Sequence, residues 1–140
     1  MKILLAVDGS PTTTRMLAYI AAHDELLGAG HQFTALTVVP AVPPGAATWI
    51  DSAVLQGWYD EQAQRVLSPV CKFAAQKDWH LEPRHAVGHA GEMVAAIAQE
   101  GGFDLIVMGT HGHSAIGNVV LGSAATRVLA GTRIPVLLVH

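Results

Sequence analysis

Short apolar runs alternate along the chain with longer stretches whose apolar residues recur at helical spacing. Residues 3–7 form a run with two apolar faces, which is typical of a strand buried on both sides. Residues 33–39, 105–108 and 136–139 predict further strands. Residues 81–87 form a weaker run with a proline inside it, so we expect that strand near an edge of the sheet.

The longer stretches predict helices at residues 12–27, 51–77, 91–99 and 123–130. Ser10 and Pro11 stand at the N-cap and at the first position of the first helix, where both residue types are favoured. Gly57 and Pro69 interrupt the second helical pattern and blur its boundaries. Residues 41–48 are rich in proline and glycine and predict a loop.

This order of elements predicts a single α/β domain over residues 1–140, with a doubly wound, five-stranded parallel sheet and helices on both faces. In such a sheet, ligands bind beyond the carboxyl ends of the strands, where the strand order reverses. The segments that follow the strands are also the polar and glycine-rich parts of the chain: residues 8–11, 38–45, 88–91 and 109–123. The pattern and the topology therefore indicate the same edge of the sheet as the binding site.

Composition excludes several classes of protein. Hydrophobic residues make up 51% of the 140 residues and charged residues 14%, which is far from the profile of a disordered chain. Eight basic residues against eleven acidic ones give a net charge of −3, which argues against a nucleic-acid partner. The single cysteine, Cys71, excludes an intramolecular disulfide and fits a reducing compartment. No apolar run has the ~18 residues of a membrane span or forms a signal peptide, so we expect a soluble cytoplasmic protein without a membrane partner.

The glycine-rich segment after the fourth strand carries the strongest candidate chemistry. Its glycines allow backbone N–H groups to turn toward an anion, and Ser123 stands where the next helix begins. No lysine separates Gly122 from Ser123, so the segment is not a Walker A loop. The first strand is followed by no dinucleotide-binding glycine fingerprint. The segment therefore predicts phosphate binding, with a purely structural long turn as the alternative.

Four residues of this segment carry a resemblance to a known family, because they stand at the spacing G-x-x-G, nine residues, G-[ST]: Gly109, Gly112, Gly122 and Ser123. Residues 3–10, 104–112 and 134–139 are also typical of that family. Over essentially its full length the chain resembles the small, single-domain universal stress proteins of the ATP-binding subgroup. The resemblance implies a flavodoxin-like (Rossmann-like) stress-response domain that binds an adenine nucleotide, ATP with Mg²⁺ or Mn²⁺, and that forms a homodimer.

The resemblance also implies roles for individual residues. Asp8 would accept a hydrogen bond from the ribose hydroxyls, although an aspartate here also suits capping of the first helix. Val38 would meet the adenine edge with its backbone groups, or would simply be a core valine, and Thr37 precedes it where the family often has histidine. Asn118 and Val119 would add backbone contacts. The ribose and the phosphates would be held by Gly109, Gly112, Gly122 and Ser123.

Catalysis needs more than a binding site. Phosphoryl transfer requires charge stabilisation and an oriented water, and lysine and arginine are sparse near the glycine-rich segment. Arg127 lies one turn into the following helix, and His111 and His113 either donate to phosphates or face solvent. Because no catalytic constellation stands out, we assign no catalytic residue. We expect a binding protein or switch with at most slow ATP hydrolysis.

Two other classes of function stay open. Four histidines fall near the predicted edge and could form a zinc or nickel site, although their spacing matches no compact signature: His85, His89, His111 and His113. The last strand, from Val136 to His140, is either an inner strand or an edge strand. An edge strand would pair with a second copy and make a homodimeric interaction module that needs no nucleotide.

The aromatic residues near the predicted loop allow two interpretations. Trp49, Trp58 and Tyr59 either anchor the loop in the core or form a partner surface, and we favour packing against the core and the loop. Cys71 falls on the second predicted helix, and we expect it to be a buried, unreactive thiol.

Overall fold

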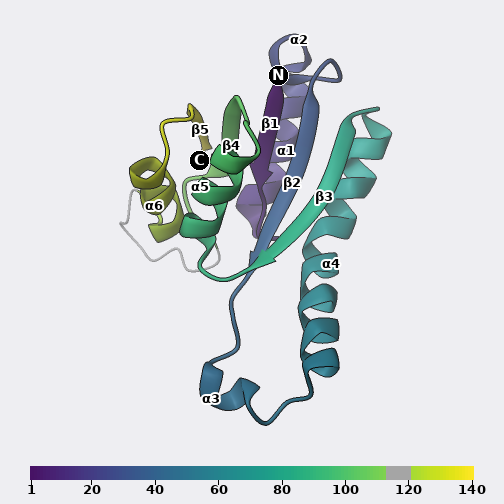
Figure 1. Cartoon of the computed structure of the whole chain (residues 1–140). Coiled ribbons are helices and arrows are strands. Elements are labelled where there is room, and N and C mark those ends of the chain that lie inside the picture. The colour runs from purple at the N-terminus through teal and green to yellow at the C-terminus, as the bar shows by residue number, and fades with distance from the viewer. Residues whose placement is uncertain (113–120) are drawn as a thin grey trace.

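The structure, a computed structural model, describes residues 1–112 and 121–140. Its strands are β1 (Lys2–Ala6), β2 (Gln32–Val39), β3 (His80–Val87), β4 (Leu105–Gly109) and β5 (Val136–Val139). They form one sheet in the order β3-β2-β1-β4-β5, and every neighbouring pair is parallel (Figure 1). The predicted doubly wound, five-stranded α/β fold is confirmed.

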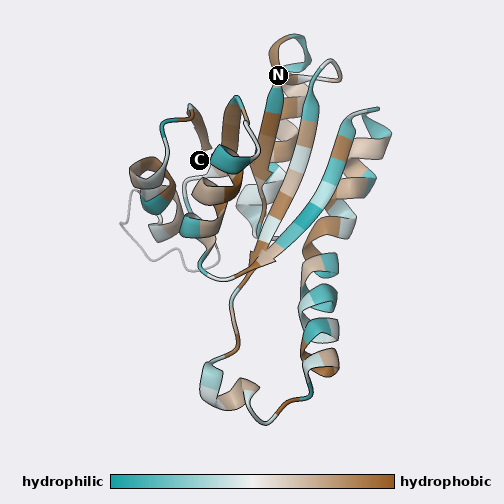
Figure 2. Ribbon diagram, in the orientation of Figure 1, coloured by the Kyte–Doolittle hydropathy of each residue, from teal (hydrophilic) through white to brown (hydrophobic). Residues whose placement is uncertain are grey.

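The strand order reverses between β1 and β4. From β1 the chain runs to β2 and to β3 at one edge, and it returns to β4 on the other side of β1. The carboxyl ends of β1 and β4 therefore form the switch point at which ligands bind in such sheets. β3 is an edge strand, as the proline at position 83 predicts, and polar residues recur along it (Figure 2). β5 forms the opposite edge of the described sheet, so the alternative of an inner strand is wrong.

The described helices are α1 (Pro11–Ala22), α2 (Asp24–Leu27), α3 (Pro44–Ala47), α4 (Ser52–Gln76), α5 (Ala90–Glu100) and α6 (Ser123–Gly131). One face of the sheet is covered by α1 and α4 and the other by α5 and α6. Successive side chains of β1 point to opposite faces. Ile3 and Leu5 pack in one core cluster with α1 and α4, while Leu4 packs in the other with α5 and α6. Burial on both faces explains why β1 and β4 are apolar without alternation. None of the described helices is both long and apolar enough to cross a bilayer.

The first predicted helix is divided in two, which the helical spacing did not reveal. α1 ends at Ala22, and His23 leaves helical geometry with φ −115° and ψ 46°. The His23 ring stacks on Tyr19 at a centroid distance of 4.2 Å, and its Nδ1 donates to the Tyr19 carbonyl at 2.8 Å. That side-chain bond occupies a carbonyl near the end of the helix, and the separate α2 then buries Leu27 in the core.

The second helix is more continuous than its sequence suggests. α4 passes through Gly57 and Pro69 without a break, and the Asp51 carboxylate caps it by accepting from the Ala53 N–H at 2.8 Å. A proline inside a helix costs about 3 kcal/mol. Burial of Leu67 and Val70 on either side of Pro69 offsets that cost.

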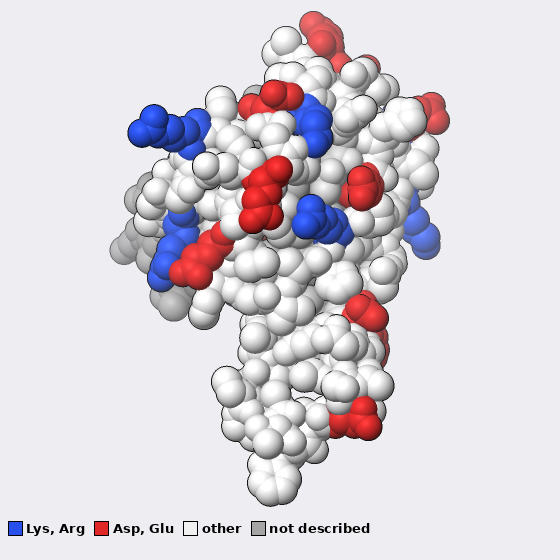
Figure 3. Space-filling model, in the orientation of Figure 1, with Lys and Arg blue, Asp and Glu red and all other residues white. Residues whose placement is uncertain are grey.

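Between β2 and Tyr59, the chain forms an arm (residues 40–58) that projects from the body as a largely uncharged protrusion (Figures 1 and 3). The loop predicted for residues 41–48 contains the short helix α3, which begins at Pro44, a residue that favours the first helical position. Trp49 is 89% exposed and Trp58 is 42% exposed, so the expected packing of these side chains in the core is wrong. Tyr59 is buried as expected, whereas Cys71 on α4 is only partly buried.

Candidate functional site

A cavity of about 630 Å³ opens at the carboxyl ends of the strands, at the switch point between β1 and β4. This volume lies within the usual range of small-molecule sites. The segments after β1, β2 and β4 line it together with the first turns of α1, α5 and α6 and with one side of α4. The lining residues include Asp8, Thr12, Thr13, Thr37, Val38, Trp58, Gln62, Val66, Val94, Gly109, Thr110, His111, Gly112, Gly122 and Ser123.

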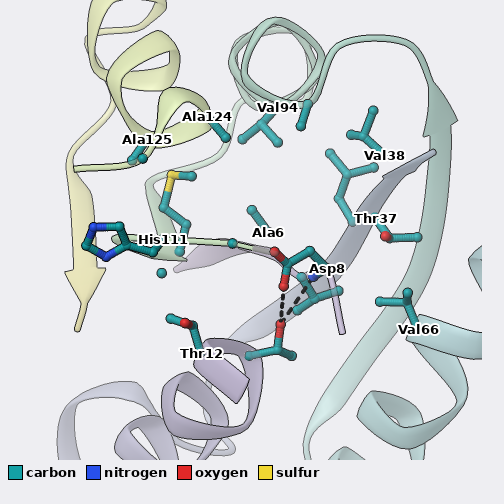
Figure 4. Close-up of a pocket in the computed structure, with 18 of the residues that line it drawn as sticks. Ala6, Asp8, Thr12, Thr37, Val38, Val66, Val94, His111, Ala124 and Ala125 are labelled. Carbon is teal, nitrogen blue, oxygen red and sulfur yellow. Dashed lines mark hydrogen bonds between the residues drawn. The ribbon is translucent and has the colours of Figure 1, made fainter. Parts of the chain in front are cut away.

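Asp8 is held at the base of the cavity by a tight turn. Its Oδ1 accepts from the Ser10 N–H at 2.9 Å and from the Thr13 hydroxyl at 3.1 Å, and the Thr13 hydroxyl accepts from the Asp8 N–H at 3.2 Å (Figure 4). Gly9 permits the turn because its φ is 76°, a conformation that L side chains rarely adopt. The carboxylate therefore has a fixed orientation before any ligand arrives.

The N-cap prediction for this turn is only half right. Ser10 occupies the N-cap position with extended backbone, and Pro11 follows at the start of α1. The Ser10 hydroxyl is buried and makes no capping bond, and it has no hydrogen-bond partner among the described residues. The Asp8 carboxylate instead accepts from the Ser10 N–H, so it orders the turn that precedes α1.

The glycines of the motif stand where a side chain would fill occupied space. A Cβ on Gly109 would overlap the Thr12 side chain, and one on Gly112 would overlap Oδ2 of Asp8. A Cβ on Gly122 would lie 3.0 Å from the Thr110 carbonyl oxygen, which already accepts from the Gly122 N–H at 2.6 Å. The two ends of the glycine-rich segment are therefore drawn together against Asp8.

The structure brings six of the predicted binding residues to one cavity: Asp8, Val38, Gly109, Gly112, Gly122 and Ser123. Val38 is partly buried on β2 beside the buried Thr37, and both line the cavity (Figure 4). Asn118 and Val119 lie outside the described residues, as does His113. Contact of these residues with a nucleotide stays a prediction.

The positive potential available to an anion here comes from the backbone. Among the described residues that line the cavity, none is lysine or arginine. Ser123, Ala124 and Ala125 form the first turn of α6 at the cavity wall, and that turn holds no acidic residue. The unpaired N–H groups and the dipole of a helix N-terminus favour an anion at this position. Arg127 points elsewhere, since it pairs with Glu92 of α5 at 2.5 Å.

The described histidines do not gather into the metal site that the sequence left open as an alternative. His85 on β3 lies 3.3 Å from the Asp60 carboxylate of α4, and His89 precedes α5. His111 lines the cavity, with its Nδ1 3.0 Å from the Thr110 hydroxyl, which is also 3.1 Å from Nδ1 of His140. Within residues 1–112 and 121–140, no group of three or more histidine, cysteine, aspartate or glutamate side chains could hold a metal ion.

Sequence reasoning missed the contribution of α4 and of three threonines. Trp58, Gln62 and Val66 line the cavity from one side of α4, and their spacing of four residues is the signal that could have grouped them. Thr12 and Thr13 stand four and five positions after Asp8, and Thr110 follows Gly109, but only the fold shows that these threonines reach the cavity.

Comparison with known proteins decides the family. The model of the universal stress protein family matches residues 1–140. The chain belongs to the universal stress protein family. A universal stress protein of Thermus aquaticus is 34% identical over 99% of this chain and 97% of its own length. Slr1230, a universal stress protein of Synechocystis, is 32% identical over 97% of this chain, which spans only 41% of that longer relative.

Solved structures share the fold of this universal stress protein. The Methanocaldococcus jannaschii protein MJ0577 superposes with a TM-score of 0.83 at 24% identity, covering 99% of this chain and 94% of that one. Three others were solved with adenine nucleotides, each with a TM-score of 0.71. An Archaeoglobus fulgidus protein holds dAMP (20% identity, 100% and 98% covered), an Arabidopsis thaliana protein holds AMP (10% identity, 99% and 90%), and a further universal stress protein holds cAMP (20% identity, 100% and 97%).

Proposed function

We propose that this universal stress protein binds an adenine nucleotide, with ATP as the ligand, in the cavity at the carboxyl ends of β1, β2 and β4. The observation that carries the proposal is the convergence of Asp8 with both ends of the glycine motif on one cavity of about 630 Å³. The adenine nucleotides bound to structural neighbours in this family support the choice of base. The protein acts as a binding protein or switch.

Each residue has a role that its chemistry and its position support. Asp8 accepts from the ribose hydroxyls, because a fixed carboxylate is a strong acceptor. The backbone groups near Val38 meet the adenine edge. The N–H groups at Gly109, Gly112, Gly122 and Ser123 hold the ribose and the phosphates, and Asn118 and Val119 add backbone contacts between them.

Hydrolysis of the bound ATP is slow at most. The described cavity lining supplies no lysine or arginine to neutralise charge that develops on a transferred phosphoryl group. Mg²⁺ or Mn²⁺ would enter with the ATP and would neutralise part of the phosphate charge, with water supplying most of its ligands. The described histidines are not needed for that arrangement.

Two copies pair through β5. This strand is apolar, follows Pro135 and stands at an edge of the described sheet, where its outer side is available to a second copy. Analytical ultracentrifugation tests the homodimer, because one chain has a mass of 14.7 kDa. Sedimentation at twice that mass is expected, and a single species of one chain at micromolar concentration would contradict it.

The binding proposal has a direct test on the purified protein. Denaturation followed by ion-exchange chromatography of the supernatant identifies any adenine nucleotide that was carried through purification. Calorimetric titration of stripped protein with ATP and Mg²⁺ should then give saturable binding near one nucleotide per chain. Neither released nucleotide nor heat would leave the nucleotide-independent interaction module as the better description.

A further inference from the structure

α4 is longer than the sheet on which it packs. Its 25 residues span about 37 Å at the helical rise, whereas the eight residues of β3 span about 26 Å. The first fully buried residue of α4 is Tyr59, and the first turns of the helix run past the carboxyl edge of the sheet (Figure 1). The overhang stands beside the mouth of the cavity.

One stripe of this helix forms a wall of the cavity. Val66, Gln62 and Trp58 all line it, and residues four apart lie one above another on a helix. Val66 and Gln62 are partly buried, while Trp58 is 42% exposed at the rim. The wall therefore rises from the sheet edge toward solvent and ends in an indole ring.

Contacts at the base of the arm hold the Trp58 indole in place. The Tyr59 hydroxyl accepts from the Val42 N–H at 2.8 Å, and the Tyr59 side chain is only 5% exposed. Trp58 packs edge-on against Tyr59 with ring centroids 5.5 Å apart. Trp49, farther out on the same arm, is 89% exposed and does not line the cavity.

Different elements line the two sides of the cavity. Thr12 and His111 lie on one side and Thr37, Val38 and Val66 on the other, with Asp8 between them (Figure 4). The side of Val38 and Val66 is the one to which α4 also contributes Trp58. A purine is a flat, apolar ring system with polar edges, and it gains affinity by stacking on an aromatic side chain. The side next to β2 and α4 therefore suits the base.

We propose that Trp58 is a specificity-determining residue of this site: its indole forms the outer wall of the base-binding half and packs against the purine of the bound nucleotide. This inference rests on the proposed nucleotide binding and adds the residue that selects an aromatic base. Gln62 lies one turn below Trp58 on the same wall, where its amide reaches a polar edge of the base.

Calorimetric titration with AMP tests whether packing against Trp58 contributes to the binding affinity. Trp58→Ala should weaken AMP binding about tenfold, the scale of one lost base–aromatic stack. Trp58→Phe keeps an aromatic face and should recover most of that loss. Trp49→Ala is the matched control on the same arm and should bind AMP like the unaltered chain.

Tryptophan fluorescence tests contact with the base. Saturating AMP should change the emission of the unaltered chain and of Trp49→Phe, and it should leave the emission of Trp58→Phe unchanged. Absence of binding of both AMP and ATP to the unaltered chain would overturn the proposed function and this inference together. If Trp58→Ala binds AMP as tightly as the unaltered chain, and AMP does not change the emission of the unaltered chain, only the proposed contact of Trp58 with the base is overturned.

Discussion

The two connections that lead from β1 and β2 to their helices reach the same cavity by opposite means. The β1 connection is a tight turn in which Asp8 is hydrogen-bonded to Ser10 and Thr13. The β2 connection is the arm, whose residues are mostly exposed and which is fastened near its base by the bond between Val42 and Tyr59. A short, internally bonded turn orients a charged group well, whereas a long connection extends a wall beyond the sheet.

The difference shows where rigidity is needed. A carboxylate or an N–H group must be oriented to within a narrow angle to bind its partner, because hydrogen bonds weaken steeply when they are misaligned. Apolar packing against a flat base is non-directional and tolerates more movement. We therefore expect the largest single effect from a substitution on the side of the tight turn and the glycine motif.

The largest effect is expected at Gly122. In Gly122→Val the new Cβ would lie 3.0 Å from the Thr110 carbonyl oxygen, and the branched side chain would enter the space left for a phosphate. ATP affinity should fall at least about a hundredfold, or roughly 2.7 kcal/mol, by calorimetry. Gly30→Val is the control, since a Cβ at Gly30 meets nothing within 4 Å. Unchanged ATP affinity in a folded Gly122→Val protein would refute the phosphate assignment.

A smaller effect is expected at Asp8, where charge and geometry can be separated. Asp8→Ala removes the acceptor of both turn bonds, and hydrogen bonds to a charged group contribute about 1.5–3 kcal/mol each. Thermal denaturation should show lower stability, and calorimetry should show about tenfold weaker ATP binding. Asp8→Asn keeps an oxygen acceptor and should retain most of the stability. Equal stability of Asp8→Ala and the unaltered chain would show that the turn is held by other contacts.

A still smaller effect is expected from removing the hydrogen bond between Val42 and Tyr59 at the base of the arm. Tyr59→Phe leaves the Val42 N–H without its acceptor at a partly buried position, which should lower the free energy of unfolding by about 1 kcal/mol. Chemical denaturation measures this loss. Tyr19→Phe is a suitable comparison, because Tyr19 is 40% exposed and lies on α1 away from the arm. Identical unfolding curves for the two variants would argue against the anchor.

The smallest effect is expected at the tip of the arm. Trp49→Ser replaces a side chain that is 89% exposed, and such surface changes alter the free energy of unfolding by about 0.5 kcal/mol or less. ATP affinity and the unfolding midpoint should both match those of the unaltered chain. A clear loss of either would mean that Trp49 contacts a surface in solution, and the contrast between the two connections would then need revision.

Much of the fold and of the candidate site could be predicted because both depend on local pattern. Residues 3–7 are apolar on both faces, which predicts a strand covered by helices on both sides, as β1 is. Pro83 predicts an edge strand because proline has no N–H to donate to a second neighbouring strand. The division of the first helix at His23 escaped prediction, since it depends on one side chain that bonds a carbonyl of its own helix. The spacing of Gly109, Gly112 and Gly122 identified the segment, but the contacts that exclude a Cβ from each position are tertiary.

The sequence by itself determined the class of the domain, the order of its elements and the edge of the sheet that carries the site, because hydrophobic periodicity and glycine spacing are properties of neighbouring residues. Only the tertiary structure decided that α4 extends beyond the sheet and brings Trp58 to the cavity that Asp8 also lines. It also decided that Trp49 is exposed and that His85 pairs with Asp60 rather than approaching His111. These outcomes depend on how far each element extends past its neighbours, and no local pattern encodes that distance.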